Sequence, residues 1–231
     1  MAAPAQGPGM LTNLPPVTKG LLIANAGVFL LQSLLGSALF APLMLWPLGV
    51  DPAMKMAGVP GFWPWQLLTY GFLHADLGHL LFNMLALLMC GAQLEYTWGQ
   101  KRFLTYFLAC VAGAGLCQLA VVSATAGQGG YPYPTLGASG GVYGLLLAYG
   151  MLFPHQRVML LIPPIPMKAR TLAIVFGVIT LVMGVTGTQA NVAHFAHLGG
   201  MLFGWLLIRY WRGQAPFGRG RGGPRPGVRR F

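Results

Sequence analysis

The sequence predicts an all-α membrane protein, a bundle of six transmembrane helices in contact with the lipid bilayer. Of its 231 residues, 55% are hydrophobic and only 7% are charged, whereas a soluble domain carries about 25% charged residues. The apolar residues come in long runs of the length that a membrane-spanning helix needs. Clusters of proline and glycine separate these runs and mark the connections. Together these observations indicate a polytopic membrane protein.

The first half of the chain contains three expected spans, at about 20–41, 77–98 and 103–124. Residues 1–18, rich in proline and glycine, are expected to form a disordered tail. The long connection 42–76 carries several aromatic residues that suit a loop at the bilayer interface; they are Trp46, Phe62, Trp63 and Trp65. This half therefore combines three helices with one interfacial loop.

The second half contains spans at about 138–153, 171–187 and 192–211, which completes a membrane domain at 19–212. Residues 213–231 form a second expected disordered tail, low in complexity and basic. The first of these spans is short, because its residues reach about 24 Å against about 30 Å of hydrocarbon. It should start below the outer surface, so the loop before it must descend into the protein, where protein or a water-filled cavity surrounds it.

The charges predict the orientation of the chain. The formal net charge is +11, and the basic residues fall mainly on one side of the predicted topology. That side holds Lys19, Lys101, Arg102, Arg157, Lys168, Arg170 and the tail, whereas the other holds Asp51, Lys55 and Asp76. By the positive-inside rule both termini are cytoplasmic. The same rule accounts for the basic tail, so we expect no nucleic-acid partner.

Ser139 begins the short fourth span within Gly137-Ala138-Ser139-Gly140, and it is one of only four serines. Backbone N–H groups at a helix N-terminus point toward such a residue and can stabilise an oxyanion. The alternative is that Ser139 only caps the helix. The position nevertheless makes it a candidate nucleophile.

A nucleophilic serine needs a base, and four of the five histidines lie at the same end of the predicted bundle as Ser139; they are His74, His79, His194 and His197. His197 is one turn into the sixth span, where burying an imidazole is costly and therefore indicates function. Glycines four apart on the fourth and sixth spans would let these helices approach closely; they are Gly140, Gly144, Gly200 and Gly204. If they do, Ser139 meets His197; the alternative is that the glycines serve packing alone.

A serine–histidine–aspartate triad looks unavailable. Glu95 lies near the cytoplasmic end of the second span and Asp51 lies in the interfacial loop, whereas Asp76 is on the same side as Ser139 but could equally be solvated. We therefore predict a dyad in which Tyr143 positions the imidazole ring. His79 and Asn83 project from one face near the outer end of the second span. They are candidate oxyanion donors, or alternatively polar residues that join helices.

These residues resemble the rhomboid family of intramembrane serine proteases over about residues 60–210. The resemblance rests on residues 65–95, which include His74-Ala-Asp-Leu-Gly-His79-Leu-Leu-Phe-Asn83, on Gly137-Ala-Ser139-Gly140 with Tyr143, and on Ala196-His197-Leu-Gly-Gly200. It implies a six-helix bundle of rhomboid type with a membrane-dipping first loop at 42–76. It also implies cleavage of peptide bonds in or near transmembrane segments of membrane-protein substrates, with no metal or cofactor. Separately, the lack of a long extra domain, extra helix or transit peptide suits a bacterial plasma membrane, which is the expected location.

The same resemblance implies roles for individual residues. Ser139 would be the nucleophile and His197 the general base. His79 and Asn83 would contribute to an oxyanion hole beside Gly137, and Tyr143 would pack on the His197 ring. Glu95 would correspond to the structural glutamate of the family, toward the cytoplasmic side. One position departs from the pattern, because Trp65 is followed by Gln66 where the family often has arginine.

Three other classes compete with this interpretation. A rhomboid-like protein that binds membrane clients without cleaving them would be expected to lack Ser139 or His197. A small transporter or channel would more naturally show an inverted repeat or charges in mid-membrane. A metalloprotease would need His-Glu-x-x-His, which this chain lacks. The sequence makes no prediction of an oligomeric state.

Overall fold

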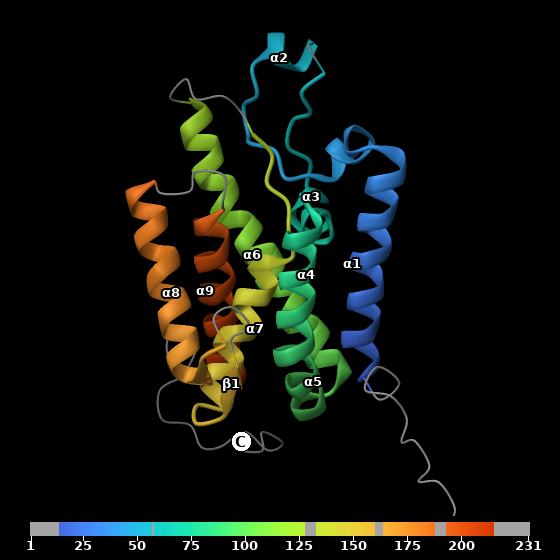
Figure 1. Ribbon diagram of the computed structural model, residues 1–231. Coiled ribbons are helices and arrows are strands. Elements are labelled where there is room, and N and C mark those ends of the chain that lie inside the picture. Colours follow the sequence, from blue (N-terminus) through green and yellow to red (C-terminus); the bar gives the residue numbers. More distant parts are fainter. Residues whose placement is uncertain (1–13, 57, 128–132, 160–163, 188–192, 215–231) are drawn as a thin grey trace, which may run out of the picture.

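The computed structural model describes residues 14–214, apart from 57, 128–132, 160–163 and 188–192. It is a bundle of helices with one small hairpin (Figure 1). The elements, in chain order, are α1 (Pro16–Leu35), η1 (Ser37–Leu43), α2 (Pro52–Met56), α3 (Gln66–Thr69), η2 (Tyr70–Phe72), α4 (Leu77–Ala86), η3 (Leu87–Gly91), α5 (Ala92–Trp98), α6 (Gln100–Gly127), α7 (Ser139–Leu152), β1 (Arg157–Met159), β2 (Pro166–Lys168), α8 (Ala169–Thr186) and α9 (His194–Trp211). Most of both expected tails lies outside the described residues.

Within the described part of the chain, four helices are long and apolar enough to cross a membrane. They are Pro16–Leu35, Leu77–Trp98, Gln100–Ala126 and Ala169–Thr186. The second is a continuous rod made of α4, the π-helical segment η3 and α5. Helix α7 is apolar but shorter, and α9 has 18 residues. The helices coincide with the spans expected from hydropathy, whereas the antiparallel hairpin β1–β2 was not expected.

Helix α1 begins at Pro16, earlier than the expected start near Gly20. Proline is tolerated in the first turn because the N–H that it lacks has no partner within the helix there. The remaining N–H groups find the Glu95 carboxylate, which accepts from Val17 N at 2.9 Å and from Thr18 N at 2.7 Å. A negative charge at a helix N-terminus is favourable. Glu95 thus joins α1 to α5, a structural role of the kind that the resemblance implies.

Helices α6, α7 and α9 form the closely packed centre of the bundle. Their closest approach is between α7 and α9, where a Cβ atom added at Gly200 would overlap the Gly140 carbonyl. Gly144 and Gly204 lie one turn further along and contact side chains of α6. The expected glycine contact between the fourth and sixth spans is therefore present. The same glycines also allow the third span, α6, to approach both helices closely.

Helix α7 starts well below the outer ends of its neighbours, as the sequence predicts (Figure 1). The segment before it descends into the bundle and is held by backbone hydrogen bonds. Leu45 and Thr135 exchange two of these, each 2.9 Å long, and Gly137 N donates to Tyr70 O at 2.9 Å. Irregular backbone at this depth needs such partners because lipid offers none.

Gln66 anchors the connection between α1 and α4. Its fully buried side chain accepts from Trp46 N at 3.1 Å and donates to Pro42 O and Gly61 O, each at 3.1 Å. The residue that departs from the family pattern thus joins three separate points of this connection. The exposed rings of Trp63 and Trp65 stack on each other beside it, 4.9 Å apart.

The basic residues gather at one end of the bundle, the lower end in Figure 1. This end holds the starts of α1, α6 and α8, the end of α9 and the hairpin. Asp51, Lys55 and Asp76 belong to the opposite end, next to α2 and the start of α4. The charge asymmetry expected from the sequence is therefore a property of the folded chain.

Candidate active site

Ser139 and His197 contact each other although 58 positions separate them in the chain. The Ser139 Oγ and His197 Nε2 atoms are 2.8 Å apart, within hydrogen-bonding distance. Ser139 is the first residue of α7, and His197 lies one turn into α9, on the face that packs against α7. The serine is half-buried and the histidine is buried. The proximity predicted from the glycine pattern is therefore confirmed.

Tyr143 lies one turn after Ser139 and stacks on the His197 imidazole. The two ring centroids are 4.1 Å apart and the planes are 4° from parallel. Residues four apart on a helix share a face, so α7 supplies both the hydroxyl and the aromatic ring against which the imidazole rests. The ring contact that the resemblance implies between Tyr143 and His197 is therefore present.

Thr180 of α8 provides a contact that the sequence analysis missed. Its buried hydroxyl lies 3.2 Å from His197 Nδ1 and 3.2 Å from His194 Nδ1. Two arrangements of protons satisfy these contacts. In the arrangement that leaves His197 Nε2 free to accept from Ser139 O–H, His197 Nδ1–H donates to Thr180, and the threonine hydroxyl donates to His194 Nδ1. The signal available in the sequence was a hydroxyl group in the middle of an otherwise apolar span.

The three carboxylates are engaged away from His197. Asp76 is the N-cap of α4, and its Oδ1 accepts from His79 N at 2.8 Å. Asp51 accepts from Ala53 N at 2.7 Å, and Glu95 binds the start of α1. The polar group beside His197 Nδ1 is therefore a threonine hydroxyl in this structure.

Gly137 separates His79 from Ser139. Its φ of +131° lies in a region that favours glycine. A Cβ atom added there would lie 2.8 Å from His79 Nε2 and 3.7 Å from Ser139 Oγ. The His79 imidazole and the Ser139 hydroxyl thus flank a position that only glycine can occupy without displacing the ring.

Asn83 is buried one turn further along α4 than His79. It is 5% exposed, and its Nδ2 has no hydrogen-bond partner among the described residues. A buried amide without a partner costs free energy, so an N–H that remains unpaired is available to an incoming acceptor. This is the property that an oxyanion donor needs.

His74 packs behind His79, with the two ring centroids 5.2 Å apart. Burial, reinforced by the neighbouring His79, lowers the pKa of His74 to about 4. His74 is therefore neutral near neutral pH. Its ring therefore packs against His79 as an uncharged group.

An apolar groove leads away from these residues between α4, η3, α7 and α8. It encloses about 380 Å³, and Asn83 and Tyr143 belong to its wall together with apolar residues such as Leu146, Leu172 and Phe176. Asn83 and Tyr143 therefore line a groove whose other walls are apolar, which suits an apolar ligand.

A bundle of long apolar helices with a serine–histidine contact below its outer ends is typical of a polytopic membrane protein with a polar site inside it. The family model for the rhomboid domain matches residues 62–213, which is most of the chain. The chain therefore belongs to the rhomboid family and is a multi-pass membrane protein.

Curated relatives include proteins from fungi, plants and bacteria. The chain is 31% identical to mitochondrial Rhomboid protein 1 of Saccharomyces cerevisiae over 62% of its length and 42% of that protein. It is 30% identical to the mitochondrial RHOMBOID-like protein 12 of Arabidopsis thaliana over 85% of its length and 59% of that protein. It is 33% identical to Rhomboid protease GluP of Bacillus subtilis over 63% of its length and 25% of that protein. The chain thus spans less than two thirds of the length of each of these relatives.

Proposed function

We propose that this protein is an intramembrane serine protease, which cleaves peptide bonds in or near transmembrane segments of membrane-protein substrates. The observation that carries the proposal is the 2.8 Å contact between Ser139 Oγ and His197 Nε2. A base within hydrogen-bonding reach of a serine hydroxyl is the geometry of an activated nucleophile. The similarity to a relative named as a rhomboid protease supports the same conclusion.

In this mechanism Ser139 Oγ forms a bond to the scissile carbonyl carbon while its proton passes to His197 Nε2. The oxyanion that develops is stabilised by His79, by the Asn83 amide and by the backbone N–H of Ser139. His197 then gives its proton to the leaving amine as the C–N bond breaks. A water molecule, deprotonated by His197, hydrolyses the acyl-enzyme and regenerates the serine.

Thr180 and Tyr143 act as positioning residues in this proposal. By accepting a hydrogen bond from Nδ1–H, Thr180 holds the His197 proton on the nitrogen remote from Ser139. The lone pair on Nε2 then faces the serine hydroxyl. Stacking on Tyr143 restricts rotation of the same ring. The two contacts together orient the imidazole ring, which is one of the tasks that a carboxylate performs in a triad.

The proposed topology has six spans: α1, α4 to α5, α6, α7, α8 and α9. Residues 19–212 form the membrane domain, and the basic end of the bundle faces the cytoplasm. The connection 42–76 lies in the bilayer interface, which the exposed Trp63 and Trp65 rings support. We place the protein in a bacterial plasma membrane with both termini cytoplasmic.

A substrate helix would reach the site beside α8, through the groove that Asn83 and Tyr143 line. Its end must unwind there, because a peptide carbonyl inside a helix is hydrogen-bonded and shielded from attack. The substrate class is therefore transmembrane segments whose ends unwind readily.

The decisive test compares Ser139→Ala with Ser33→Ala, a change at an exposed serine of α1. Purified variants in detergent receive a model transmembrane substrate, and cleavage is followed by gel electrophoresis. We expect Ser139→Ala to lose at least about 10⁴-fold in activity, as serine proteases do without their nucleophile, while Ser33→Ala stays near wild type.

A fluorophosphonate probe gives an independent result, because it labels only an activated serine. We expect labelling of the wild type at Ser139 and none of Ser139→Ala. If Ser139→Ala still cleaves the substrate, the assignment is wrong. If the folded wild type neither cleaves nor reacts with the probe, the protein is instead a rhomboid-like protein that binds membrane clients.

A further inference from the structure

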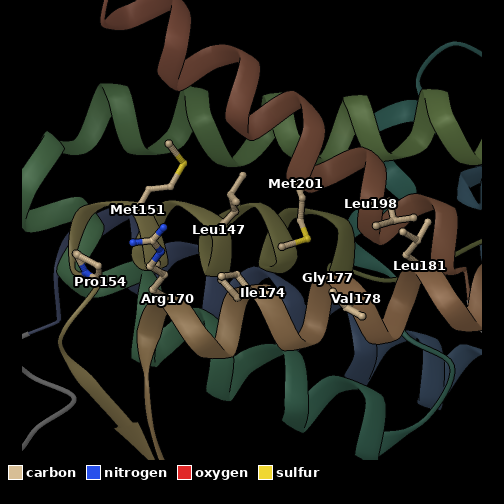
Figure 2. Close-up of a pocket in the computed structure, with 12 residues that line it drawn as sticks. Leu147, Met151, Pro154, Arg170, Ile174, Gly177, Val178, Leu181, Leu198 and Met201 are labelled. Carbon is tan, nitrogen blue, oxygen red and sulfur yellow. The ribbon is translucent and has the colours of Figure 1, made fainter.

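We propose that a second groove along α8, distinct from the groove that Asn83 and Tyr143 line, binds one anionic phospholipid. The groove runs between α7, α8 and α9 and encloses about 670 Å³. Figure 2 shows Arg170 and Pro154 at one end and apolar side chains along the rest. The inference does not depend on proteolytic activity.

The groove has the length of one lipid leaflet. Arg170 lies in the first turn of α8, and the lining residue farthest along the same helix is Leu181. Eleven helical residues rise about 17 Å, and half of a hydrocarbon core is about 15 Å. An acyl chain that starts at Arg170 would therefore end near Leu181, close to the middle of the bilayer.

Arg170 lines the end of the groove, and two further cations, Arg157 and Lys168, lie on the hairpin that leads into α8. These three residues are called the cationic cluster. Arg157 and Lys168 are directly opposite each other in the hairpin that joins α7 to α8, and both are exposed. Like charges in this position repel. Among the described residues the cluster has no acidic partner, because Glu95 binds the start of α1 and both aspartates belong to the opposite end of the bundle.

This combination selects one occupant. A phosphate diester placed at the cluster would offset the repulsion, and basic pockets between transmembrane helices bind anionic headgroups for this reason. A second transmembrane helix would need contacts across about 30 Å, about twice the length of the groove. A zwitterionic lipid would bring its own cation toward three others. The charge and length together therefore favour an anionic phospholipid.

Gly177 offers a way to fill the groove without removing charge. It is a lining residue on α8, and a Cβ atom added there would make ordinary contact with the end of the flexible Met201 side chain, at 3.4 Å. A leucine at this position projects into the space that the acyl chain would occupy. Gly177→Leu therefore tests the groove, while changes at the cations test the headgroup site.

The experiment is a titration of the purified protein with phosphatidylglycerol or phosphatidylcholine in mixed micelles, with bound lipid counted by native mass spectrometry. We expect one phosphatidylglycerol to bind the wild type at least about tenfold more tightly than phosphatidylcholine. Each removed cation should weaken binding about fivefold, and the combined Arg157→Gln, Lys168→Gln, Arg170→Gln variant about a hundredfold. Gly177→Leu should reduce binding of both lipids.

The matched control neutralises three exposed cations at the same end of the bundle but away from the groove, with Lys19→Gln, Lys101→Gln and Arg212→Gln. It should bind phosphatidylglycerol as the wild type does. Equal losses in the control and the cluster variant would overturn the proposal, because they would indicate unspecific attraction to a basic surface. Unchanged binding by both the cluster variant and Gly177→Leu would also overturn it, as would a spectrum with a second copy of the chain or a transmembrane peptide in place of lipid. Thermal unfolding of each variant confirms that it is folded.

Discussion

Helices α6 and α8 both pack against α9, which carries His197, yet they are held in very different ways. The most apolar window of α6 is 50% buried within the protein, and that of α8 is 22% buried. Close contacts through glycine join α6, α7 and α9, whereas grooves flank α8 on two sides. The serine and the histidine therefore stand on the tightly packed part of the bundle, and Thr180 stands on the loosely packed part.

This difference suggests that α6, α7 and α9 have one role at the site and that α8 has another. The distance between Ser139 and His197 is set by helix packing that leaves no room for adjustment. In the proposed mechanism the tautomer of His197 depends on the Thr180 hydroxyl, which stands on a helix flanked by two grooves. We therefore expect changes at the packed helix contacts to displace His197 from Ser139, and changes on α8 to alter the hydrogen bonding of His197 without displacing it.

The largest effect is expected from Gly200→Ala, because its Cβ atom would overlap the Gly140 carbonyl. Backbone cannot move aside as a flexible side chain does, so α9 must shift and carry His197 with it. Misplacement of a catalytic group by about 1 Å costs about a hundredfold in rate, and overpacking costs about 1–3 kcal/mol of stability. Cleavage kinetics and thermal unfolding measure both effects.

The matched control is Gly177→Ala on α8, where an added methyl group meets only the end of Met201. It should retain wild-type activity and unfold no earlier. Equal losses in the two variants would remove the distinction between a tightly packed and a loosely packed part.

Thr180→Val should have the next largest effect, because it keeps the shape of the side chain but removes the hydrogen-bond acceptor for His197 Nδ1–H. A buried donor left unpaired costs about 1–3 kcal/mol, so we expect kcat to fall about 10- to 100-fold with little change in KM. The rate of fluorophosphonate labelling should fall in parallel. Thr180→Ser restores the hydroxyl and should recover most of the rate, whereas loss of packing alone would not be rescued in this way.

The sequence predicted the positions of the long helices and the meeting of Ser139 with His197. Helix positions follow from hydropathy because lipid solvates apolar side chains directly. The Ser139–His197 contact followed from Gly140 and Gly200, since paired small residues predict which helices can approach closely. Both predictions rest on patterns within single helices, namely hydropathy and the spacing of glycines, which determine how the helices insert and pack.

The contact with Thr180 could not be predicted in this way, because it depends on the rotation of α8 about its own axis. An exposed and uniformly apolar helix gives hydropathy no preferred face. The early start of α1 was missed for a related reason, since the partner of its first N–H groups, Glu95, lies 77 positions away from Thr18. Long-range polar pairings of single residues leave little trace in a sequence.

A smaller effect is expected from Gln66→Leu, which tests the connection between α1 and α4, a buried part of the structure away from Ser139 and His197. The change removes three hydrogen bonds, one from the buried Trp46 N–H and two to the Pro42 and Gly61 carbonyls. We expect a loss of about 1–3 kcal/mol in stability, because the Trp46 N–H is left without this partner. Activity should decrease a few-fold, because the same connection contains Tyr70, whose carbonyl accepts from Gly137 N two residues before Ser139. Thermal unfolding is the primary measurement, and an unchanged melting temperature would contradict the anchoring role.

The smallest effect is expected from Asp76→Asn, although Asp76 is the acid nearest in sequence to His79. Its carboxylate caps α4 by accepting from His79 N, and asparagine caps a helix about as well. Activity should therefore stay within about twofold of wild type, whereas Asp76→Ala, which loses the cap, should cost about 1 kcal/mol of stability. If Asp76→Asn instead lost several orders of magnitude in kcat, a carboxylate on α4 would be orienting the base. The orientation of His197 would then depend on Asp76 at the start of α4 and not on Thr180 of α8. The proposed difference between the two parts of the bundle would be wrong.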